Sequence, residues 1–175
     1  SSDLDEPEAK ATFDLSLKFD AEEGDTALSN MPEINSHLRE ETGVWTFETT
    51  PRMSTYLLAF GFGALHGKTA KTKNGTEVGV FATVAQAENS FDFALNIAVR
   101  VIEFYEDYFQ VKYPIPLSYH LALPDFSAGA MENWGLVTYR EVYLLVDENS
   151  SAASRQQVAL IVAHELAHQW FGNLV

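Results

Sequence analysis

The residues whose types and spacing most directly indicate chemistry are His164, Glu165 and His168, in the run His-Glu-Leu-Ala-His. Side chains four residues apart lie on one face of an α-helix, so the two imidazoles can point at the same ion. Imidazole nitrogen is a usual ligand of zinc, and catalytic zinc sites keep one position open for water. Glu165 can accept a proton from that water. The pattern therefore predicts a zinc ion held by His164 and His168, with Glu165 as the general base.

The residues around this motif favour a helix. Residues 154–157 match a capping box, in which Ser154 would cap the first turn. Val158 and Val162 then supply an apolar stripe, and Gly172 is suited to end the helix. The alternative is a chance match on a polar helix face, but the cap and the stripe favour the metal-binding interpretation.

Composition excludes several classes of partner. The chain has 175 residues, a formal net charge of −14 and no cysteine. Its 12 Phe, 7 Tyr and 3 Trp are typical of a packed globular protein. The negative charge argues against binding to nucleic-acid phosphates, and no run has the length of a transmembrane helix. We expect neither nucleic acid nor a membrane as a partner. Without cysteine there is no disulfide or thiolate site, which is compatible with a reducing cytoplasm.

The first sixty residues have the pattern of short antiparallel strands. Apolar and polar residues alternate over 11–20 and again over 44–49. Residues 53–62 are predicted to form one longer apolar strand. This part therefore reads as a β-rich piece that ends near residue 66.

The remainder of the chain has a mixed pattern. Asn74-Gly75 between two extended runs predicts a β-hairpin. Apolar residues recur at helical spacing over 87–109, which predicts a long amphipathic helix. Further strands are predicted at 118–123, 136–139 and 142–146. The pattern predicts the α+β class, with a change of domain between residues 66 and 67.

A second constellation, Gly129-Ala130-Met131-Glu132-Asn133, precedes the metal helix by about thirty residues. Its small residues leave a backbone edge open to a ligand. An extended peptide can hydrogen-bond there as an added strand, and the Glu132 carboxylate can pair with a positive group. Taken alone, the pentapeptide favours an ordinary turn whose Glu132 and Asn133 are simply solvated.

Together, Gly-Ala-Met-Glu-Asn at 129–133 and His-Glu-Leu-Ala-His-Gln-Trp-Phe-Gly-Asn at 164–173 resemble the aminopeptidase N family of zinc metallopeptidases, in forms close to those of lactic-acid bacteria. The likeness extends to residues 5–13, 53–60 and 121–126. It implies that residues 1–66 form the C-terminal part of an antiparallel, β-rich N-terminal domain. Residues 67–175 would form the N-terminal part, a mixed sheet plus helices, of a thermolysin-like zinc peptidase domain.

The resemblance also implies an activity and roles for residues. It implies a cytoplasmic zinc aminopeptidase that releases N-terminal amino acids from peptides with a free N-terminus. Glu132 would bind the substrate α-amine, since a buried carboxylate is costly unless it is paired. The other residues of that motif would contact the substrate: Gly129, Ala130, Met131 and Asn133. His164 and His168 would be the zinc ligands and Glu165 the general base.

The chain lacks two parts of the family pattern. The third zinc ligand, a glutamate about eighteen residues beyond the second histidine, and a later tyrosine would both lie past Val175. We therefore expect this chain to be a fragment that binds zinc weakly and hydrolyses little by itself. A truncated domain also exposes apolar surface, which favours self-association.

Three alternatives stay open. A thermolysin-type endopeptidase would share the zinc motif, but the amine-binding role implied for Glu132 favours an exopeptidase. A non-catalytic peptide-binding scaffold is disfavoured for the parent protein by the intact Glu165, but it stays open for the fragment alone. The epoxide-hydrolysing branch of the family has a similar motif set. The other histidines have no ligand-like partner at short spacing and are interpreted as surface or structural residues: His37, His66 and His120.

Overall fold

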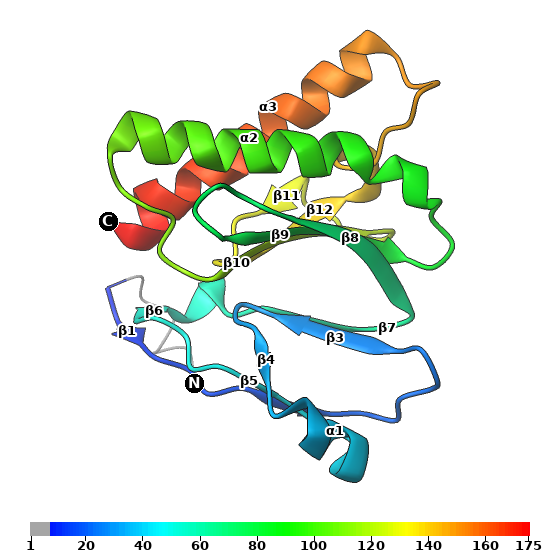
Figure 1. The fold of residues 1–175 in the computed structure, drawn as a ribbon, viewed down its shortest axis with the longest axis vertical. Helices are drawn as coiled ribbons and strands as arrows, with labels where there is room; N and C mark the ends of the chain where they lie inside the picture. Colours follow the sequence, from blue (N-terminus) through cyan, green and yellow to red (C-terminus); the bar gives the residue numbers. More distant parts are fainter. Residues whose placement is uncertain (1–7) are drawn as a thin grey trace.

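Two long helices cover one face of a mixed sheet, and a smaller β unit lies below the other face (Figure 1). This arrangement is that of a computed structural model, which describes residues 8–175. Asp5, Glu6 and Pro7 of the family-like segment lie outside the described residues. The predicted α+β class, with antiparallel strands first and a mixed sheet with helices after them, is confirmed.

The β unit as described contains three small antiparallel sheets. Their order is β2-β5-β4, β1-β6 and β3-β7. The strands are β1 (Lys10–Ala11), β2 (Ser16–Lys18), β3 (Thr26–Ser29), β4 (Glu33–Ile34), β5 (Val44–Phe47), β6 (Met53–Ser54) and β7 (Phe60–Gly63), with helix α1 (Ser36–Thr42) between β4 and β5. The alternation over 11–20 places Leu15, Leu17 and Phe19 on one face of the chain. That face packs on buried Trp45 and Phe47.

The single long strand predicted for residues 53–62 is wrong. The chain forms β6, then a 3-10 turn over Thr55–Leu57, and only later β7. The side chain of Asn30 explains the interruption. Its Nδ2 donates to the carbonyl of Leu57 at 2.7 Å, and its Oδ1 accepts from the amide of Ala59 at 2.9 Å. These backbone groups are therefore satisfied by a side chain instead of a strand partner.

The mixed sheet has the order β11-β12-β10-β9-β8. Its strands are β8 (Leu65–Lys71), β9 (Glu77–Thr83), β10 (Leu117–Leu123), β11 (Ala130–Met131) and β12 (Leu136–Arg140). β8 and β9 form the hairpin predicted from Asn74-Gly75, and Gly75 has the positive φ of 89° that this turn requires. β10 runs parallel to both β9 and β12, while β11 is an antiparallel edge strand. Because β8 begins at Leu65, the predicted domain change between residues 66 and 67 falls within this strand.

The strand predicted at 142–146 is also wrong. A 3-10 turn occupies Glu141–Tyr143, and the amides of Leu144 and Leu145 both donate to the carbonyl of Glu141, at 3.1 and 2.9 Å. Leu144 and Val146 are buried in the main core. This apolar run therefore fills the core from a turn and does not pair with a strand.

Helices α2 (Asp92–Phe109) and α3 (Ala152–His168) pack on the sheet and on each other. The apolar face of α2 is buried at Ala98 and Ile102, as its periodicity predicted, and Ala94 is buried as well. The hydroxyl of Tyr105 donates to the carbonyl of Ala163 at 2.9 Å and so ties the two helices together. No helix in the described part of the chain is both long and apolar enough to cross a membrane.

The predicted cap of α3 is wrong by three residues. Ser151 is the cap, because its hydroxyl accepts from the amide of Ser154 at 3.1 Å. Ala152 and Ala153 then form the first helical positions, where alanine has the highest intrinsic propensity. The capping-box pattern starting at Ser154 matched a stretch that is already inside the helix.

Asn30 also anchors the β unit to the loop between β11 and β12. Its Nδ2 donates to the carbonyl of Trp134 at 2.6 Å. The next residue, Gly135, has a φ of 79°, and a Cβ there would lie 2.1 Å from the backbone oxygen of Asn30. Only glycine allows this close approach, which fixes the loop that carries Glu132.

Candidate metal centre

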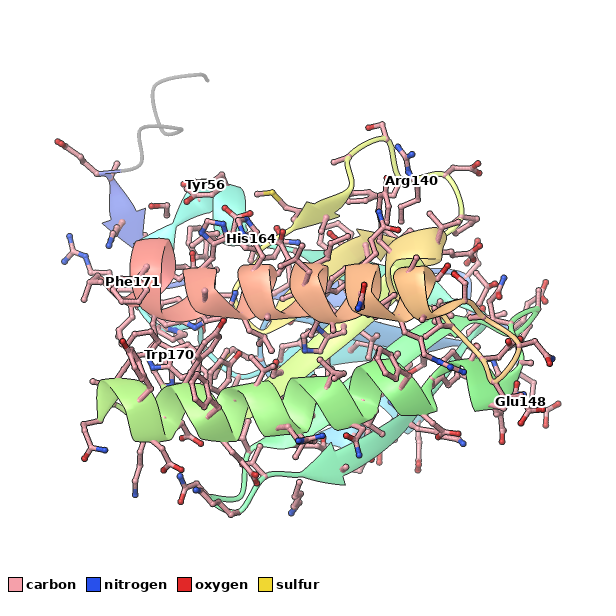
Figure 2. The ribbon with its side chains drawn as sticks, turned by 90° about the horizontal axis from the view of Figure 1, so that it is seen from above. Tyr56, Arg140, Glu148, His164, Trp170 and Phe171 are labelled. Carbon is pink, nitrogen blue, oxygen red and sulfur yellow. The ribbon has the colours of Figure 1, made fainter. Side chains whose placement is uncertain are left out.

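His164 and His168 converge on one point beside α3. Their Nε2 atoms are 3.1 Å apart, and their rings meet edge to face at 86°. His164 is exposed and His168 is partly buried. Figure 2 shows His164 on the side of α3 that faces away from α2, whereas Trp170 lies on the side toward α2. The helix thus uses one side for packing and leaves the other for the histidine pair.

The spacing of the two nitrogens fits a shared zinc ion. Two nitrogens that each lie about 2.0–2.1 Å from a tetrahedral zinc are about 3.3 Å apart, close to the 3.1 Å found here. Within residues 8–175 no group of three or more His, Asp or Glu side chains is arranged to hold a metal. The described residues therefore offer two candidate ligands, whereas catalytic zinc usually has three protein ligands.

Glu165 is held in the interior next to this pair. It is 7% exposed, and its Oε2 has no hydrogen-bond partner among the described residues. Burial raises the pKa of the Glu165 carboxyl, the negative charge of Glu132 raises it further, and His164 and His168 oppose this shift. A carboxylate with a raised pKa and an oxygen that has no hydrogen-bond partner is suited to accept a proton.

Residues 129–133 form the edge of the sheet nearest α3. Ala130 and Met131 make up β11 and pair with Tyr139 and Thr138 of β12. The carbonyl of Gly129 accepts from the amide of Arg140 at 3.0 Å. Because β11 has a neighbour on one side only, its other edge is available to an extended chain.

Arg140 braces the loop that leads into β11. Its Nη2 donates to the carbonyl of Ser127 at 2.7 Å and its Nε to that of Phe126 at 3.1 Å. The side chain lies at the far end of this region from His164 (Figure 2). The loop is therefore held by hydrogen bonds from the Arg140 side chain to its backbone carbonyls.

Glu132 and Asn133 follow β11 and have different surroundings. Glu132 is partly exposed, and its charge acts on Glu165. Asn133 is buried, and its Nδ2 donates to the carbonyl of Leu136 at 3.1 Å and to the hydroxyl of Thr138 at 3.3 Å. Asn133 thus closes the loop itself, whereas Glu132 is free to meet a ligand.

Sequence reasoning assigned no role to Gln169 and Asn173, although both lie in the 164–173 motif. They lie in a wide turn over Gln169–Leu174 that follows α3, and the backbone angles of Phe171 and Gly172 within it are not helical. Both side chains donate to the carbonyl of Glu132, at 3.2 and 3.0 Å. The signal available in the sequence was only that two amide residues follow the histidine pair, one directly and one four positions later.

A buried, hydrogen-bonded group of polar side chains lies in the sheet around Tyr139. His120 is hydrogen-bonded through Nδ1 to the hydroxyl of Tyr139 at 2.7 Å and through Nε2 to that of Ser118 at 3.1 Å. Burial lowers the pKa of His120 to about 3. Burial also raises the pKa of Tyr139, and the charge of Glu165 adds to that effect. His120 is thus a neutral interior residue, which agrees with its structural interpretation.

Two family models match the chain. The model of the peptidase M1 N-terminal domain matches residues 3–57, and that of the peptidase family M1 domain matches residues 93–175. The chain belongs to peptidase family M1. The two matches fall on the β unit and on the region that carries the histidine pair.

Relatives of this M1 chain are named as aminopeptidases. Aminopeptidase N of Lactococcus lactis subsp. lactis is 98% identical over 172 residues, and aminopeptidase N of L. lactis subsp. cremoris strain MG1363 is 64% identical over 173 residues. Each match covers 98% of this chain and 20% of the relative. Endoplasmic reticulum aminopeptidase 1 of Mus musculus is 49% identical over 174 residues, which cover 98% of this chain and 18% of that protein. The chain spans about a fifth of the length of these relatives.

Proposed function

We propose that this chain is part of a zinc-dependent aminopeptidase that releases N-terminal amino acids from peptides. The observation that carries the proposal is the convergence of the His164 and His168 Nε2 atoms beside a buried, unpartnered oxygen of Glu165. Membership of family M1 and the aminopeptidase names of the relatives support it. Bound zinc would lower the pKa of a water molecule and polarise the scissile carbonyl.

Glu165 acts as the proton carrier in this proposal. Its buried carboxylate accepts the proton of the attacking water and then gives it to the departing amine. The raised pKa of Glu165 favours this role, because a stronger base accepts the proton more readily near neutral pH. The free Oε2 provides the atom that receives the proton.

The edge strand β11 and Glu132 hold the substrate. The peptide backbone extends along the open edge at Gly129, Ala130 and Met131, and Glu132 binds the free α-amine. An ammonium near Glu132 also offsets the repulsion between the Glu132 and Glu165 carboxylates. Because the amine is fixed at one place, only the first peptide bond reaches the metal. The role of Asn133 is to shape this loop.

We also infer the partners and location of the enzyme, and the activity of the isolated chain. Peptides with a free N-terminus are the partners, and the net charge of −14 disfavours nucleic acid. A cytoplasmic location is proposed from the resemblance to the aminopeptidase N family, and the absence of cysteine is compatible with it. The isolated 175-residue chain is proposed to be inactive, because its described residues offer only two ligands for the metal.

Comparison of free and N-acetylated peptides tests the exopeptidase proposal. Residues 1–175 are placed in the corresponding segment of the full-length L. lactis subsp. lactis relative, and kcat/KM is measured for both peptides. We expect cleavage of the free peptide at least about 100-fold faster, since acetylation removes the charge that pairs with Glu132. Glu132→Gln should reduce the ratio of kcat/KM for the free peptide to kcat/KM for the N-acetylated peptide. Comparable cleavage of the blocked peptide would instead indicate a thermolysin-type endopeptidase.

A further inference from the structure

Two buried amide side chains bind the same carbonyl oxygen. Gln169 is 0% and Asn173 3% exposed, and their side-chain nitrogens donate to the backbone oxygen of Glu132 at 3.2 and 3.0 Å. A carbonyl oxygen has two lone pairs, so both bonds form together. They join the residue with the proposed amine-binding carboxylate directly to the turn that follows His168.

Gln169 reaches further along the same loop. Its Oε1 accepts from the amide of Gly135 at 3.4 Å, and its Nε2 also lies 3.5 Å from the carbonyl of Glu165. A single side chain therefore connects the metal helix with both ends of the 132–135 segment. Burying an amide is costly unless it is hydrogen-bonded, so these contacts determine where the side chain lies.

The orientation of the Asn173 amide is set by its bond to the carbonyl of Glu132. Its Oδ1 is buried and has no partner among the described residues, while its Nδ2 is bonded to the carbonyl of Glu132. The reverse orientation would bring two acceptor oxygens together. The bond to Glu132 is thus what sets this side chain, even though its other end stays unpaired.

We propose that Gln169 and Asn173 are positioning residues that fix the distance between the Glu132 carboxylate and the histidine pair, and thereby set the preference for a free α-amine. This inference rests on the proposed function. The selectivity of an exopeptidase depends on that distance, because amine and scissile carbonyl are separated by a fixed length of peptide. A small shift of the Glu132 backbone therefore weakens amine recognition without removing either metal ligand.

Two ligands that differ only in the α-amine distinguish a positioning role of Gln169 and Asn173 from a general effect on protein stability. The probes are an α-amino hydroxamate and its des-amino analogue, both of which chelate zinc while only the first meets Glu132. Their affinities for the full-length protein carrying residues 1–175 are measured by calorimetry. The ratio of the two affinities reports amine recognition alone, and metal analysis checks that each variant retains zinc.

The variants keep side-chain volume and remove the donors. Gln169→Met and Asn173→Leu should each lower the affinity ratio roughly 10-fold, and the double variant by more than the product, because it leaves the Glu132 carbonyl without a partner. Trp170→Phe is the matched control. It removes a bond from the same turn to a different carbonyl, that of Val111 at 3.1 Å, and should leave the ratio unchanged.

Each outcome decides one question. A lower ratio in the two single variants with zinc retained supports the positioning role. An unchanged ratio in both, or an equal fall in Trp170→Phe, overturns it. If the leucine variant fails to fold, Asn173→Ala is used under the same criteria. A wild-type protein that shows no preference for the amine would contradict the proposed function itself, irrespective of the variants.

Discussion

Glu165 illustrates how environment makes one side chain suitable for chemistry. The carboxyl is buried, its pKa is raised by burial first and by Glu132 second, and one of its oxygens has no partner in the described chain. Glu132 stands at the end of an edge strand with its backbone held and its side chain partly exposed. The two glutamates thus have different surroundings, which suit the proposed roles of Glu165 as proton acceptor and of Glu132 as ligand for an ammonium.

Burial of His120 should make the free energy of unfolding depend on pH. Its pKa is about 3 in the folded chain, against 6.5 in a model peptide. Its ring faces Ser118 and Tyr139, and Glu165 lies near Tyr139. Between these two pKa values the unfolded chain binds a proton that the folded chain does not. This histidine therefore lowers the free energy of unfolding by about 1.4 kcal/mol for each pH unit below 6.5.

Urea unfolding of wild type and His120→Gln between pH 6.5 and 4 measures this effect. The variant should be less stable at pH 7 but lose stability less steeply as the pH falls. His37→Gln, which removes an exposed histidine on α1, is the matched control and should keep the wild-type slope. Parallel pH profiles for wild type and His120→Gln would show that His120 is not the group responsible.

At the scale of elements, α3 aligns its two histidines because its start and end are both defined. Ser151 caps the first turn, and the wide turn over Gln169–Leu174 follows His168. Tyr105 and Trp170 fix the side that faces α2, since Trp170 packs on both Tyr105 and Phe109. The rotation of α3 about its axis is therefore determined by packing on one side, which leaves the histidine pair on the other.

The cap of α3 provides a prediction at this scale. Ser151→Ala should lower the free energy of unfolding by about 1 kcal/mol, because the amide of Ser154 loses its acceptor. Ser154→Ala should cost clearly less, since that residue is inside the helix. Thermal unfolding of the two variants provides the comparison. A larger loss in Ser154→Ala would favour the capping box that the sequence alone indicated.

The sequence alone predicted those helices and hairpins whose formation depends on residues close to one another in the chain. The hairpin at Asn74-Gly75 and the helix over Asp92–Phe109 follow from turn chemistry and periodicity. Contacts from distant residues explain the failures. Asn30 interrupts the strand predicted at 53–62 from 27 and 29 positions away. Likewise, Gln169 and Asn173 reach an acceptor 37 and 41 positions earlier, which no local pattern encodes.

At the scale of the whole molecule, the β unit supports the site from below. Asn30 connects it to the carbonyl of Trp134, and Gly135 allows the two backbones to meet. The loop with Glu132 is thus held from one side by the β unit and from the other by the turn after α3. Large apolar side chains are exposed on α2, on α3 and on the turn after α3: Phe104, Tyr108, Leu160 and Phe171.

These side chains predict self-association of the isolated chain. Phe104 is 60% and Tyr108 70% exposed, and their rings stack on each other on α2. We expect sedimentation velocity to detect dimers or larger species at roughly 100 µM, and Phe104→Ser with Tyr108→Ser to reduce them. Lys18→Ser, on an exposed strand position, is the control. A purely monomeric wild-type chain at that concentration would contradict the expectation.

Zinc titration of this 175-residue chain by calorimetry tests whether His164 and His168 hold the metal. We expect one weak site per chain that is lost in both His164→Ala and His168→Ala and retained in His66→Ala. Weak binding is expected because only two ligands are in place in the described residues. Identical titrations of the wild type and the His164→Ala variant would contradict the claim that this histidine pair holds the metal.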